Sequence, residues 1–497
     1  EFEVTAAKDR GYYSPNSTAA TRLNTPLNET PQSIYILNEE LLRDIAATDL
    51  NEILRYSPEV GVGEGLDEVR PGIRGFELSD PLVDGFSEPA KSPASTANLE
   101  RVEVLAGPSS IFFANNSGIG GGINRATKRP NFGRSVGSIE FNIKSEDYYR
   151  AVFDHTGPIK EGGPWAYRLV TEAYTANQNS GYVQDFVYKK RLAVMPSLGW
   201  RPSERTTLYL NGEILFENNS REYPMDYVAA GQIVPVPMAV NPRSEFVDEH
   251  FKKFSLRALL YHNLSANWAL RTGASALVFY RDAGFITFGA NAALNADRRS
   301  ISRTARQFTY GTNEEYAVQM DLAGKFTTGP LAHQAVLGTD FDHSITDSFT
   351  RSGAFSPTRF DLYAPDYTQQ PATLAPSRDQ VLRVNRPNFY VNDQIRLWEG
   401  RVILSGGLRA STYSQGNSRT TYPAGVETPA PKVSFDGAWV YQPRAGVVYR
   451  PWPSTSLYYS YAETFQARTN TNPDGSTFPP STGIQHEVGA KLTLRDG

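Results

Sequence analysis

Cysteine is absent from the 497 residues of this chain. That absence excludes a disulfide scaffold, a zinc–thiolate site, an iron–sulfur cluster and a cysteine nucleophile. Long apolar runs are missing too: the mean hydropathy is −0.43, and no stretch reaches the roughly 18 apolar residues of a membrane helix. The 49 basic residues nearly balance the 53 acidic ones, so the basic excess of a nucleic-acid-binding protein is not present.

The chain is rich instead in aromatic residues and turn formers, with 27 Tyr, 26 Phe, 40 Gly and 33 Pro. This composition indicates many strands joined by many loops. A membrane β-barrel remains compatible with the low hydropathy, because its strands place only every second residue on lipid. At 55.0 kDa the chain is long enough for two or three domains.

The sequence pattern divides the chain into three parts. Residues 1–28 are polar without a sustained period, which predicts an extended, mobile arm. Residues 29–130 mix short strand-like pieces with two helical patterns, for which Asn38 and Thr48 are the predicted N-caps, and form a small α+β domain. Residues 131–497 lose the helical period and alternate apolar with polar residues.

The alternation in residues 131–497 predicts long strands with one lipid-facing side. The apolar positions include Leu210, Ile214, Met320 and Leu322, and the polar positions between them include Asn211, Gln319 and Asp321. Segments of about 10 residues or more suit a tilted membrane strand. A soluble β-sandwich or propeller is the alternative, since it also buries one face. Short turns beside Trp200 and Trp452, together with long polar connections elsewhere, favour the membrane barrel.

Several motifs of the small domain resemble the plug domain of TonB-dependent outer-membrane receptors. They are residues 29–34 (ETPQSI), 47–54 (ATDLNEIL), 73–76 (IRGF), 83–86 (VDGF), 98–110 (NLERVEVLAGPSS), 120–124 (GGGIN) and 127–130 (TKRP). Later motifs resemble the ferric-siderophore branch of that family: residues 199–202 (GWRP), 390–394 (YVNDQ), 460–465 (SYAETF) and 478–483 (FPPSTG). The resemblance implies a transmembrane antiparallel β-barrel of twenty-two strands with an N-terminal α+β plug inside its lumen.

The chain departs from the family pattern in three places. Ala106 stands where a basic residue commonly precedes the Gly-Pro of the plug motif, and Phe113-Ala114 stands where Tyr-Gly is usual. About fifteen segments have strand character, and the sequence stops in a turn at residues 494–497. Because unpaired backbone groups in hydrocarbon would each cost several kcal/mol, we expect the C-terminal strands of the barrel to be missing from residues 131–497.

A cluster of glycines is predicted to form tight turns where the plug packs closely against the barrel wall. Its members are Gly107, Gly118, Gly120, Gly121 and Gly122. A phosphate-cradling loop is the alternative, and the lack of a following Lys-Ser or Lys-Thr argues against it.

Two arginines of the plug are candidates for holding it in place. The family position of Arg74 and Arg101 implies that they pair with carboxylates of the barrel wall and lock the plug, as a buried guanidinium requires such partners. The alternative is that both are ordinary arginines on a wetted surface.

The first residues resemble part of the short segment by which family members contact TonB. The match covers Phe2, Glu3, Val4 and Thr5, and such a segment would pair with its partner as an added strand. A disordered chain terminus is the alternative.

Ligand contacts are predicted at the outer mouth, where aromatic side chains stack on a bound chelate. The candidates are Tyr223, Tyr227 and Tyr280, with an interfacial girdle as the alternative role. Asp340, Asp342 and His343 crowd one strand, but no further ligand stands at a diagnostic spacing, so no metal site is predicted. No cofactor is expected, since an iron chelate brings its own ligands.

The predicted function is binding and transport. No Ser-His-Asp, paired-carboxylate or HExxH pattern occurs at a meaningful spacing, so an enzyme is not expected. The resemblance implies a TonB-dependent, proton-motive-force-energised receptor that imports ferric siderophores across the outer membrane of a Gram-negative bacterium. Its partners would be TonB with its inner-membrane complex, the siderophore and outer-membrane lipid, without nucleic acid. The alternatives are import of cobalamin, a carbohydrate or a peptide, and a passive plugged porin.

Overall fold

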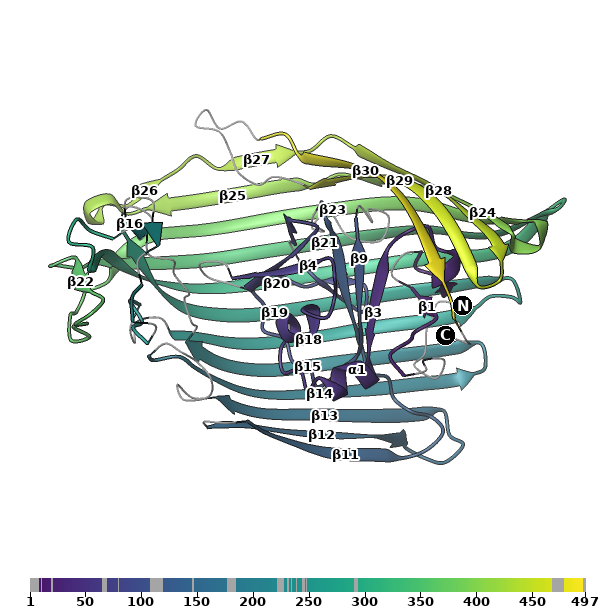
Figure 1. The fold of residues 1–497 in the computed structure, drawn as a ribbon, viewed down its shortest axis with the longest axis horizontal. Helices are drawn as coiled ribbons and strands as arrows, with labels where there is room; N and C mark the ends of the chain where they lie inside the picture. Colours follow the sequence, from purple (N-terminus) through teal and green to yellow (C-terminus); the bar gives the residue numbers. More distant parts are fainter. Residues whose placement is uncertain are drawn as a thin grey trace.

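One large antiparallel sheet curves around a smaller inner body (Figure 1). The computed structural model describes residues 9, 11–18, 21–64, 69–78, 80–107, 119–144, 147–176, 185–220, 228–229, 232–233, 235–237, 239–243, 246, 248–289, 294–466 and 478–494. No helix in these ranges is long and apolar enough to cross a membrane.

The inner body, which we call the plug, is built on a five-stranded sheet of order β3-β9-β10-β7-β8. The main-sheet bounds are β3 (Ile34–Asn38), β7 (Leu82–Val83), β8 (Phe86–Ser87), β9 (Leu99–Ala106) and β10 (Gly121–Thr127). A second, three-stranded sheet consists of β4 (Val60–Glu64), β5 (Val69–Ile73) and β6 (Phe76–Glu77). The remaining elements are α1 (Glu39–Asp44), α2 (Leu50–Leu54), the pair β1 (Asn16–Ser17) and β2 (Thr25–Pro26), and the 3-10 turn η2 (Leu27–Glu29).

The two helices of the plug begin at side-chain caps. Asn38 caps α1 as predicted, because its Oδ1 accepts the Leu41 N–H at 3.2 Å. The cap of α2 is Asp49 rather than Thr48: Asp49 Oδ1 accepts the backbone N–H groups of Asn51 and Glu52. Thr48 does not cap the helix: its backbone N–H donates to the carboxylate of Glu52, inside the helix, at 2.7 Å.

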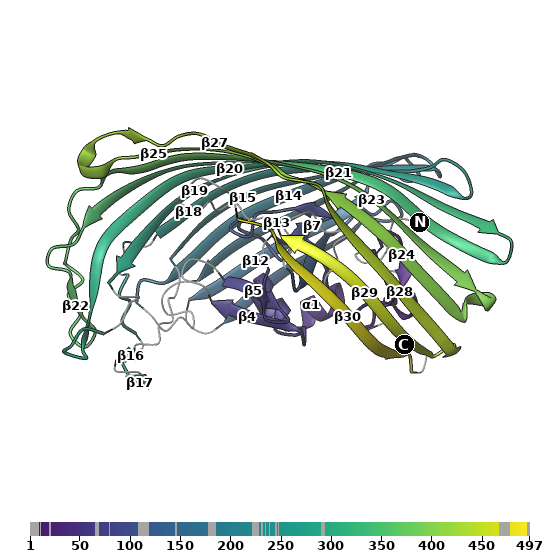
Figure 2. The same cartoon turned by 90° about the horizontal axis from the view of Figure 1, so that it is seen from above.

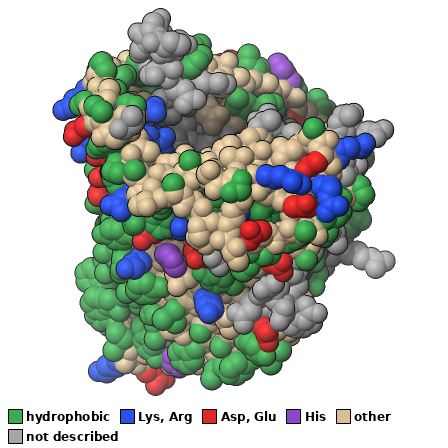
Figure 3. All heavy atoms as spheres, turned by 90° about the vertical axis from the view of Figure 1, so that its left-hand side faces the viewer, with side chains coloured by type: hydrophobic (Ala, Val, Ile, Leu, Met, Phe, Trp, Pro, Cys, Tyr) green, Lys and Arg blue, Asp and Glu red, His purple; other side chains and the backbone are tan. Residues whose placement is uncertain are grey.

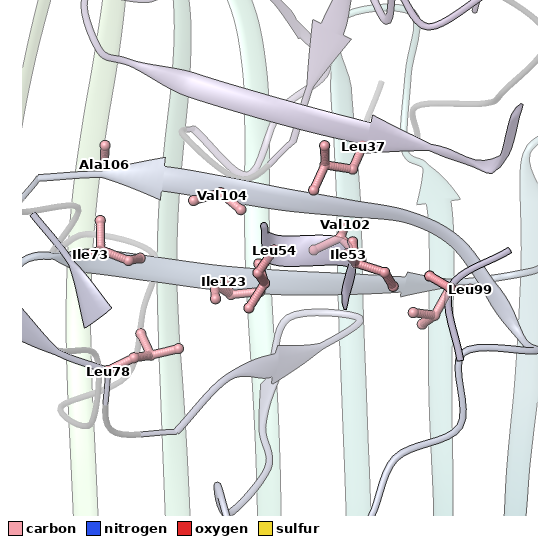
Figure 4. Packing of buried hydrophobic residues seen from close by; sticks show 11 residues of the cluster. Leu37, Ile53, Leu54, Ile73, Leu78, Leu99, Val102, Val104, Ala106 and Ile123 are labelled. Atoms are coloured by element: carbon pink, nitrogen blue, oxygen red, sulfur yellow. The ribbon is translucent and has the colours of Figure 1, made fainter. Parts of the chain in front are cut away.

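A compact apolar core holds the plug together (Figure 4). Val102 and Val104 from β9 and Ile123 from β10 meet Ile53 and Leu54 from α2, and all five side chains are fully buried. Burying one such side chain stabilises a fold by about 1.5–3 kcal/mol. The helices therefore stay on the sheet despite their short length.

The large sheet has eighteen strands in sequence order. Their bounds are β11 (Val136–Lys144), β12 (Tyr148–Pro158), β13 (Trp165–Ala176), β14 (Tyr188–Ser203), β15 (Thr206–Ser220), β18 (Asp248–Asn263), β19 (Trp268–Phe288), β20 (Ser300–Thr328), β21 (Leu331–Ala354), β22 (Arg359–Asp361), β23 (Ala375–Leu397), β24 (Val402–Ser411), β25 (Ser414–Thr421), β26 (Thr428–Pro429), β27 (Val433–Asp436), β28 (Val440–Trp452), β29 (Thr455–Gln466) and β30 (Ser481–Leu492). The short elements β16 (Val228–Ala229), β17 (Gln232–Ile233), η5 (Trp398–Gly400) and η6 (Pro423–Gly425) lie in its connections.

The strand count exceeds the predicted fifteen because some crossings are interrupted. β24 and β25 both pair with β23, and β27 and β28 continue the next crossing. β22 and β26 are only three and two residues long. When two strands that follow each other along the same neighbouring strand are counted as one, the number of strands comes close to the predicted fifteen. The sheet is only partly closed, with β11 and β30 at its two edges (Figure 2).

The two ends of the barrel differ as the turn lengths predict. At one end β14–β15, β20–β21 and β28–β29 are joined by two-residue turns, whereas connections such as 221–247 and 355–374 at the other end are long. Among the described residues, four of the five exposed tryptophans lie at the short-turn end, namely Trp165, Trp268, Trp398 and Trp452, whereas Trp439 precedes β28. Aromatic side chains at this level are typical of a membrane interface.

The two faces of the wall follow the predicted alternation. Ile214 and Met320 point outward and are 40% and 50% exposed, whereas Asn211 and Asp321 point inward and are 1% and 0% exposed. The inward polar residues are buried because the plug fills the lumen behind them (Figure 2).

The described part of residues 1–28 differs from the predicted extended arm. Ser14, Ser17, Arg22 and Leu23 are all buried, and β1 pairs with β2 inside the barrel. Polar composition suggested solvent, but the lumen wall is polar as well and supplies partners for these groups.

Candidate functional site

Two tight turns carry charged side chains from the plug toward the wall. Arg74-Gly75 joins β5 to β6, and Asp84-Gly85 joins β7 to β8, with φ values of 53°, 83°, 54° and 87° in that order. Positive φ at both central residues is the type I′ hairpin turn, in which glycine is favoured at the second position. The motifs at residues 73–76 and 83–86 are therefore turn sequences that present one charge each.

Asp84 and Glu88 form the plug side of a buried charge cluster. Glu88 accepts from Arg125 of the plug at 2.9 Å and from Lys253 of the wall at 3.0 Å. Asp84 accepts from the backbone and hydroxyl of Thr127, and Arg257 of the wall lies 3.6 Å from its carboxylate. All these side chains are nearly inaccessible to solvent, so each charge depends on its partners.

The charges of this cluster are set by the contacts between plug and wall. Burial alone would raise the pKa of Glu88, but Lys253, Arg125 and Arg257 outweigh it and hold that pKa well below its usual range. Burial likewise opposes ionisation of Asp84, and Arg129, Arg257 and the Thr127 hydrogen bonds bring its pKa below the usual value. Both groups stay ionised while the plug is seated.

A second set of contacts ties the start of the plug to the short-turn end of the barrel. Glu29 pairs with Arg396 at 2.7 Å and with Arg450 at 3.3 Å. Lys491 of β30 donates to three backbone carbonyls of the plug, at 2.7, 2.7 and 2.8 Å. Here too the carboxylate or carbonyl belongs to the plug and the cation to the wall.

The two predicted plug arginines differ from each other. Arg74 donates to Glu487 of β30 at 3.0 Å and pairs with Glu59 of the plug, so it reaches a wall carboxylate as predicted. Arg101 is buried, and within the described residues its ion pairs are with Asp9 and Glu100, both at 3.9 Å. Neither is a wall residue, because the β9 backbone directs Arg101 toward the N-terminal segment instead.

Arg22 holds the N-terminal segment inside the lumen. Its guanidinium lies 3.2 Å from Asp340 and 3.5 Å from Asp321, and donates to the Tyr390 hydroxyl at 2.7 Å. Arg409 also pairs with Asp340 at 2.9 Å. Asp340, which lies beside Asp342 and His343 in the sequence, therefore pairs with a cation of the plug. Among the described residues, no group of three side chains could hold a metal ion.

The described glycines of the predicted cluster differ in what lies close to them. Gly107 and Gly121 have φ values of 89° and 142°. A Cβ at Gly107 would collide with Gln485 of the wall, and one at Gly120 with the Ile73 carbonyl. Gly122 lies in β10, and Gly118 lies outside the described residues. The predicted close approach to the wall is present at Gly107, whereas Gly120 lies against Ile73 of the plug itself. Gly121 and Gly122 are strand residues of β10 and do not form the predicted turns.

Above the plug the lumen is hollow. A cavity of about 500 Å³, the inner chamber, lies between the plug residues Glu77 and Asp80 and the wall residues Glu315 and Arg386. A cavity of about 750 Å³, the outer chamber, lies farther toward the long connections and is lined by Arg243, Arg281, Asp347 and Arg378 among others. Lys91, Asn313 and Thr346 border both chambers. Cavities of this size can hold a small molecule.

Of the three predicted tyrosine contacts, Tyr280 does not line these chambers. Tyr280 points outward and is 46% exposed, because its neighbours Phe279 and Arg281 take the inward positions of β19. Its position fits the interfacial girdle that was the alternative. Tyr223 and Tyr227, like Phe2, Glu3, Val4 and Thr5, lie outside the described residues.

Sequence reasoning missed the residues that seat the plug from the wall, namely Lys253, Arg257, Arg396, Arg450 and Lys491. A signal existed, since each is a cation at an inward position of an alternating strand. The partner of each could not be found, because pairing depends on the height at which the plug sits.

Comparison with known proteins places the chain among receptors. A family model described as TonB dependent receptor-like, beta-barrel matches residues 199–497, and one described as TonB-dependent Receptor Plug Domain matches residues 26–122. The metal-pseudopaline receptor CntO of Pseudomonas aeruginosa is 27% identical over all of this chain and 69% of the relative. The ferrichrome outer membrane transporter/phage receptor of Escherichia coli is 25% identical over 97% of this chain and 67% of the relative.

The fold is also that of solved receptors. The ferric-catecholate import receptor Fiu of Escherichia coli, in its closed form, superimposes with a TM-score of 0.85 at 19% identity, over 97% of this chain and 74% of Fiu. The resemblance and the fold class that the sequence predicted are confirmed.

Proposed function

Because the chain belongs to the TonB-dependent receptor family, we propose that it imports ferric siderophores through an energised movement of its plug. Family members are receptors in the outer membrane of Gram-negative bacteria and are not enzymes, as the sequence predicted. The long-connection end of the barrel is then extracellular, and the short-turn end, where β30 contacts residues 27–32, is periplasmic.

The hollow above a seated plug is the observation that carries this proposal. The two chambers, of about 750 and 500 Å³, have room for a chelate. Below them, the buried ion pair Glu88–Lys253 and the partly buried pair Glu29–Arg396 hold the plug against the wall. A ligand can therefore bind without passing, and passage requires these contacts to break.

Energy for that step must come from outside the barrel, since the outer membrane holds no ATP. We assign the coupling to TonB and its inner-membrane complex, through Phe2, Glu3, Val4 and Thr5. Proline at Val4 removes a backbone donor and restricts Glu3. In a Val4→Pro strain, uptake should be lost while binding at the extracellular face persists; a Val4→Ala strain should retain both. Normal uptake in Val4→Pro would move the coupling segment elsewhere.

The cargo is tested by growth on single chelates. A strain lacking this receptor should fail to grow on its ferric siderophore under iron limitation and recover when the gene is restored. Growth that depends on cobalamin, a carbohydrate or a peptide instead would overturn the assignment. A large steady current in planar bilayers would indicate a passive pore, whereas a seated plug predicts very little.

A chelate of another metal is the second candidate cargo. It is favoured by the 27% identity to a protein named as a metal-pseudopaline receptor. Growth assays in medium depleted of zinc, nickel or cobalt would separate the two cargoes, because iron limitation alone would then leave the strain unaffected.

A further inference from the structure

A groove lies on the outward face of the wall, over β11 to β15. It has a volume of about 650 Å³, and we call it the wall groove. Ala151 of β12 and Ala173 of β13 lie opposite each other in the sheet and form its floor. Phe141 of β11 is the cross-strand partner of Ala151, and Leu192 of β14 is that of Ala173. Two small side chains are therefore flanked on both sides by large apolar ones.

The wall groove opens toward lipid and not toward the lumen. Phe141 and Leu192 are 73% and 51% exposed. Arg150 and Arg191, which alternate with the groove residues along β12 and β14, are buried on the inner side and share the carboxylate of Glu172. Figure 3, which views the long-connection end, shows hydrophobic side chains gathered on the convex flank of the wall, at the left and bottom of the view. A hollow among such side chains takes up an acyl chain, because water in it would lack hydrogen-bond partners.

A row of polar side chains borders the wall groove on the side of the long connections. Tyr149, Thr175, Lys190 and Asn218 are successive cross-strand partners on β12, β13, β14 and β15, one outward position beyond the alanine floor. All four line the groove. In the described part of the chain, no carboxylate pairs with Lys190, whose ammonium lies 5.9 Å from the ring of Tyr188. The row therefore offers hydroxyl, amide and ammonium donors to a group at the edge of the hydrocarbon.

The positive charge of this row belongs to Lys190. Lys252 of β18 also points outward, but Asp282 of β19 lies in the adjacent row of the same face, so these two charges offset each other. The apolar hollow by itself cannot select a lipid, since acyl chains are equally apolar everywhere around the barrel. Selection must come from the headgroup, and an anionic headgroup is the kind that Lys190 attracts.

We propose that the wall groove is a binding site for one lipid of the extracellular leaflet, with an acyl chain over Ala151 and Ala173 and a phosphate of its headgroup at Lys190. The ligand class is an acylated lipid with a phosphorylated headgroup. A lipid bound in this way holds the extracellular ends of β12 to β15 at the level of the headgroups. The site is independent of the cargo, because it lies on the opposite face of the wall from the plug.

Native mass spectrometry of the full-length receptor in detergent tests the site. Lipid A, an acylated glycolipid with two phosphates, is the probe, and the same lipid with both phosphates removed is the comparison. We expect one tightly bound lipid A per receptor, held at least about fivefold more tightly than the dephosphorylated form. The preference should shrink as salt rises, because salt screens the attraction between charges at an exposed site.

A charge reversal at the polar row locates the headgroup. Lys190→Glu should abolish the preference for the phosphorylated lipid, because a carboxylate then faces the phosphate. Lys160→Glu is the matched control, since Lys160 is an exposed lysine in the turn between β12 and β13, at the opposite end of the wall. The control should retain the preference of the unmodified receptor.

A filled floor locates the acyl chain. Ala151→Leu/Ala173→Leu closes the groove with apolar side chains, so the barrel still inserts into a membrane, and the variant should lose the bound lipid. Ala258→Leu/Ala274→Leu is the matched control, because these two alanines are an outward cross-strand pair on β18 and β19 that does not line the groove. The control should keep its lipid.

Three other outcomes would overturn the proposal. Equal binding of the two forms of lipid A by the unmodified receptor would indicate ordinary solvation by lipid. Equal losses in Ala151→Leu/Ala173→Leu and in its control would place the lipid elsewhere on the wall. A receptor dimer that disappears in Ala151→Leu/Ala173→Leu would show that a second copy of the chain covers this face. None of these results bears on the proposed function, which growth and uptake measure separately.

Discussion

The inner wall of the barrel faces the plug along one part and the chambers along another, and the two parts use the same kinds of residue differently. Facing the plug, Lys253 and Arg257 are buried and matched by Glu88 and Asp84. Facing the outer chamber, Arg378 of β23 lines a cavity instead. Alternation therefore determines only that a side chain points inward. Whether it holds a structure together or meets a ligand depends on what occupies the lumen at its level.

The largest loss of stability is expected when a carboxylate of the plug is removed. Glu88→Ala should cost about 3–5 kcal/mol, because Arg125 and Lys253 would remain buried with one partner fewer. The measurement is the urea concentration at which the plug becomes sensitive to protease in the detergent-solubilised receptor. Glu161→Ala, in an exposed turn, is the control and should change stability by less than about 0.5 kcal/mol. Equal effects of the two variants would show that the cluster does not seat the plug.

A charge on the outward face should cost somewhat less. Leu256 lies in the middle of β18 and is 56% exposed, so Leu256→Arg should cost about 2–4 kcal/mol when the barrel folds into a bilayer. Thr309→Arg, which adds the same side chain to the lining of the outer chamber, should cost far less. Gln319 is unsuitable as the inward control, because it donates to the Gly85 carbonyl of the plug at 2.6 Å. Similar penalties for Leu256→Arg and Thr309→Arg would mean that the outward face does not contact lipid.

Acid should loosen the contacts between the plug and the wall. The folded-state pKa values of Asp84 and Glu88 lie below the ordinary 3.8 and 4.5. Their stabilisation is therefore fully present above those ordinary values and is lost as pH falls through the folded-state values. Each unit of difference is worth about 1.4 kcal/mol. Protease sensitivity of the plug should rise steeply below about pH 4, and an Asp84→Asn/Glu88→Gln variant should show a flatter pH profile. An identical profile in that variant would assign the acid response to other groups.

The smallest effect is expected at Arg74, although its family position singles it out. Its side chain is 31% exposed, and exposed ion pairs contribute only about 0–1 kcal/mol. Arg74→Gln should therefore lower plug stability by no more than about 1 kcal/mol, and Arg74→Lys by less. A loss as large as that of Glu88→Ala would make the Arg74–Glu487 pair a principal lock of the plug.

The sequence motifs determined more of the local structure than the amino-acid composition did. Residues 73–76 and 83–86 encode two type I′ turns, and the alternation of residues such as Asn211 and Ile214 sets the two faces of the wall. Both are local, because turn geometry and strand pleating follow from neighbouring residues. The predicted arm failed in its described part, since polar composition does not distinguish bulk water from a polar lumen that accepts Arg22.

By itself the sequence determined the alternating strands of the wall and the family. Only the tertiary structure decided that Asp84 and Glu88 seat the plug, that Arg101 pairs near the N-terminus, and that Tyr280 faces outward. It also brought Lys91, Arg243 and Arg378 to one chamber from three separate segments. The physical reason is that periodicity fixes the direction of a side chain, whereas its partner depends on the register of distant strands and on the height of the plug inside them.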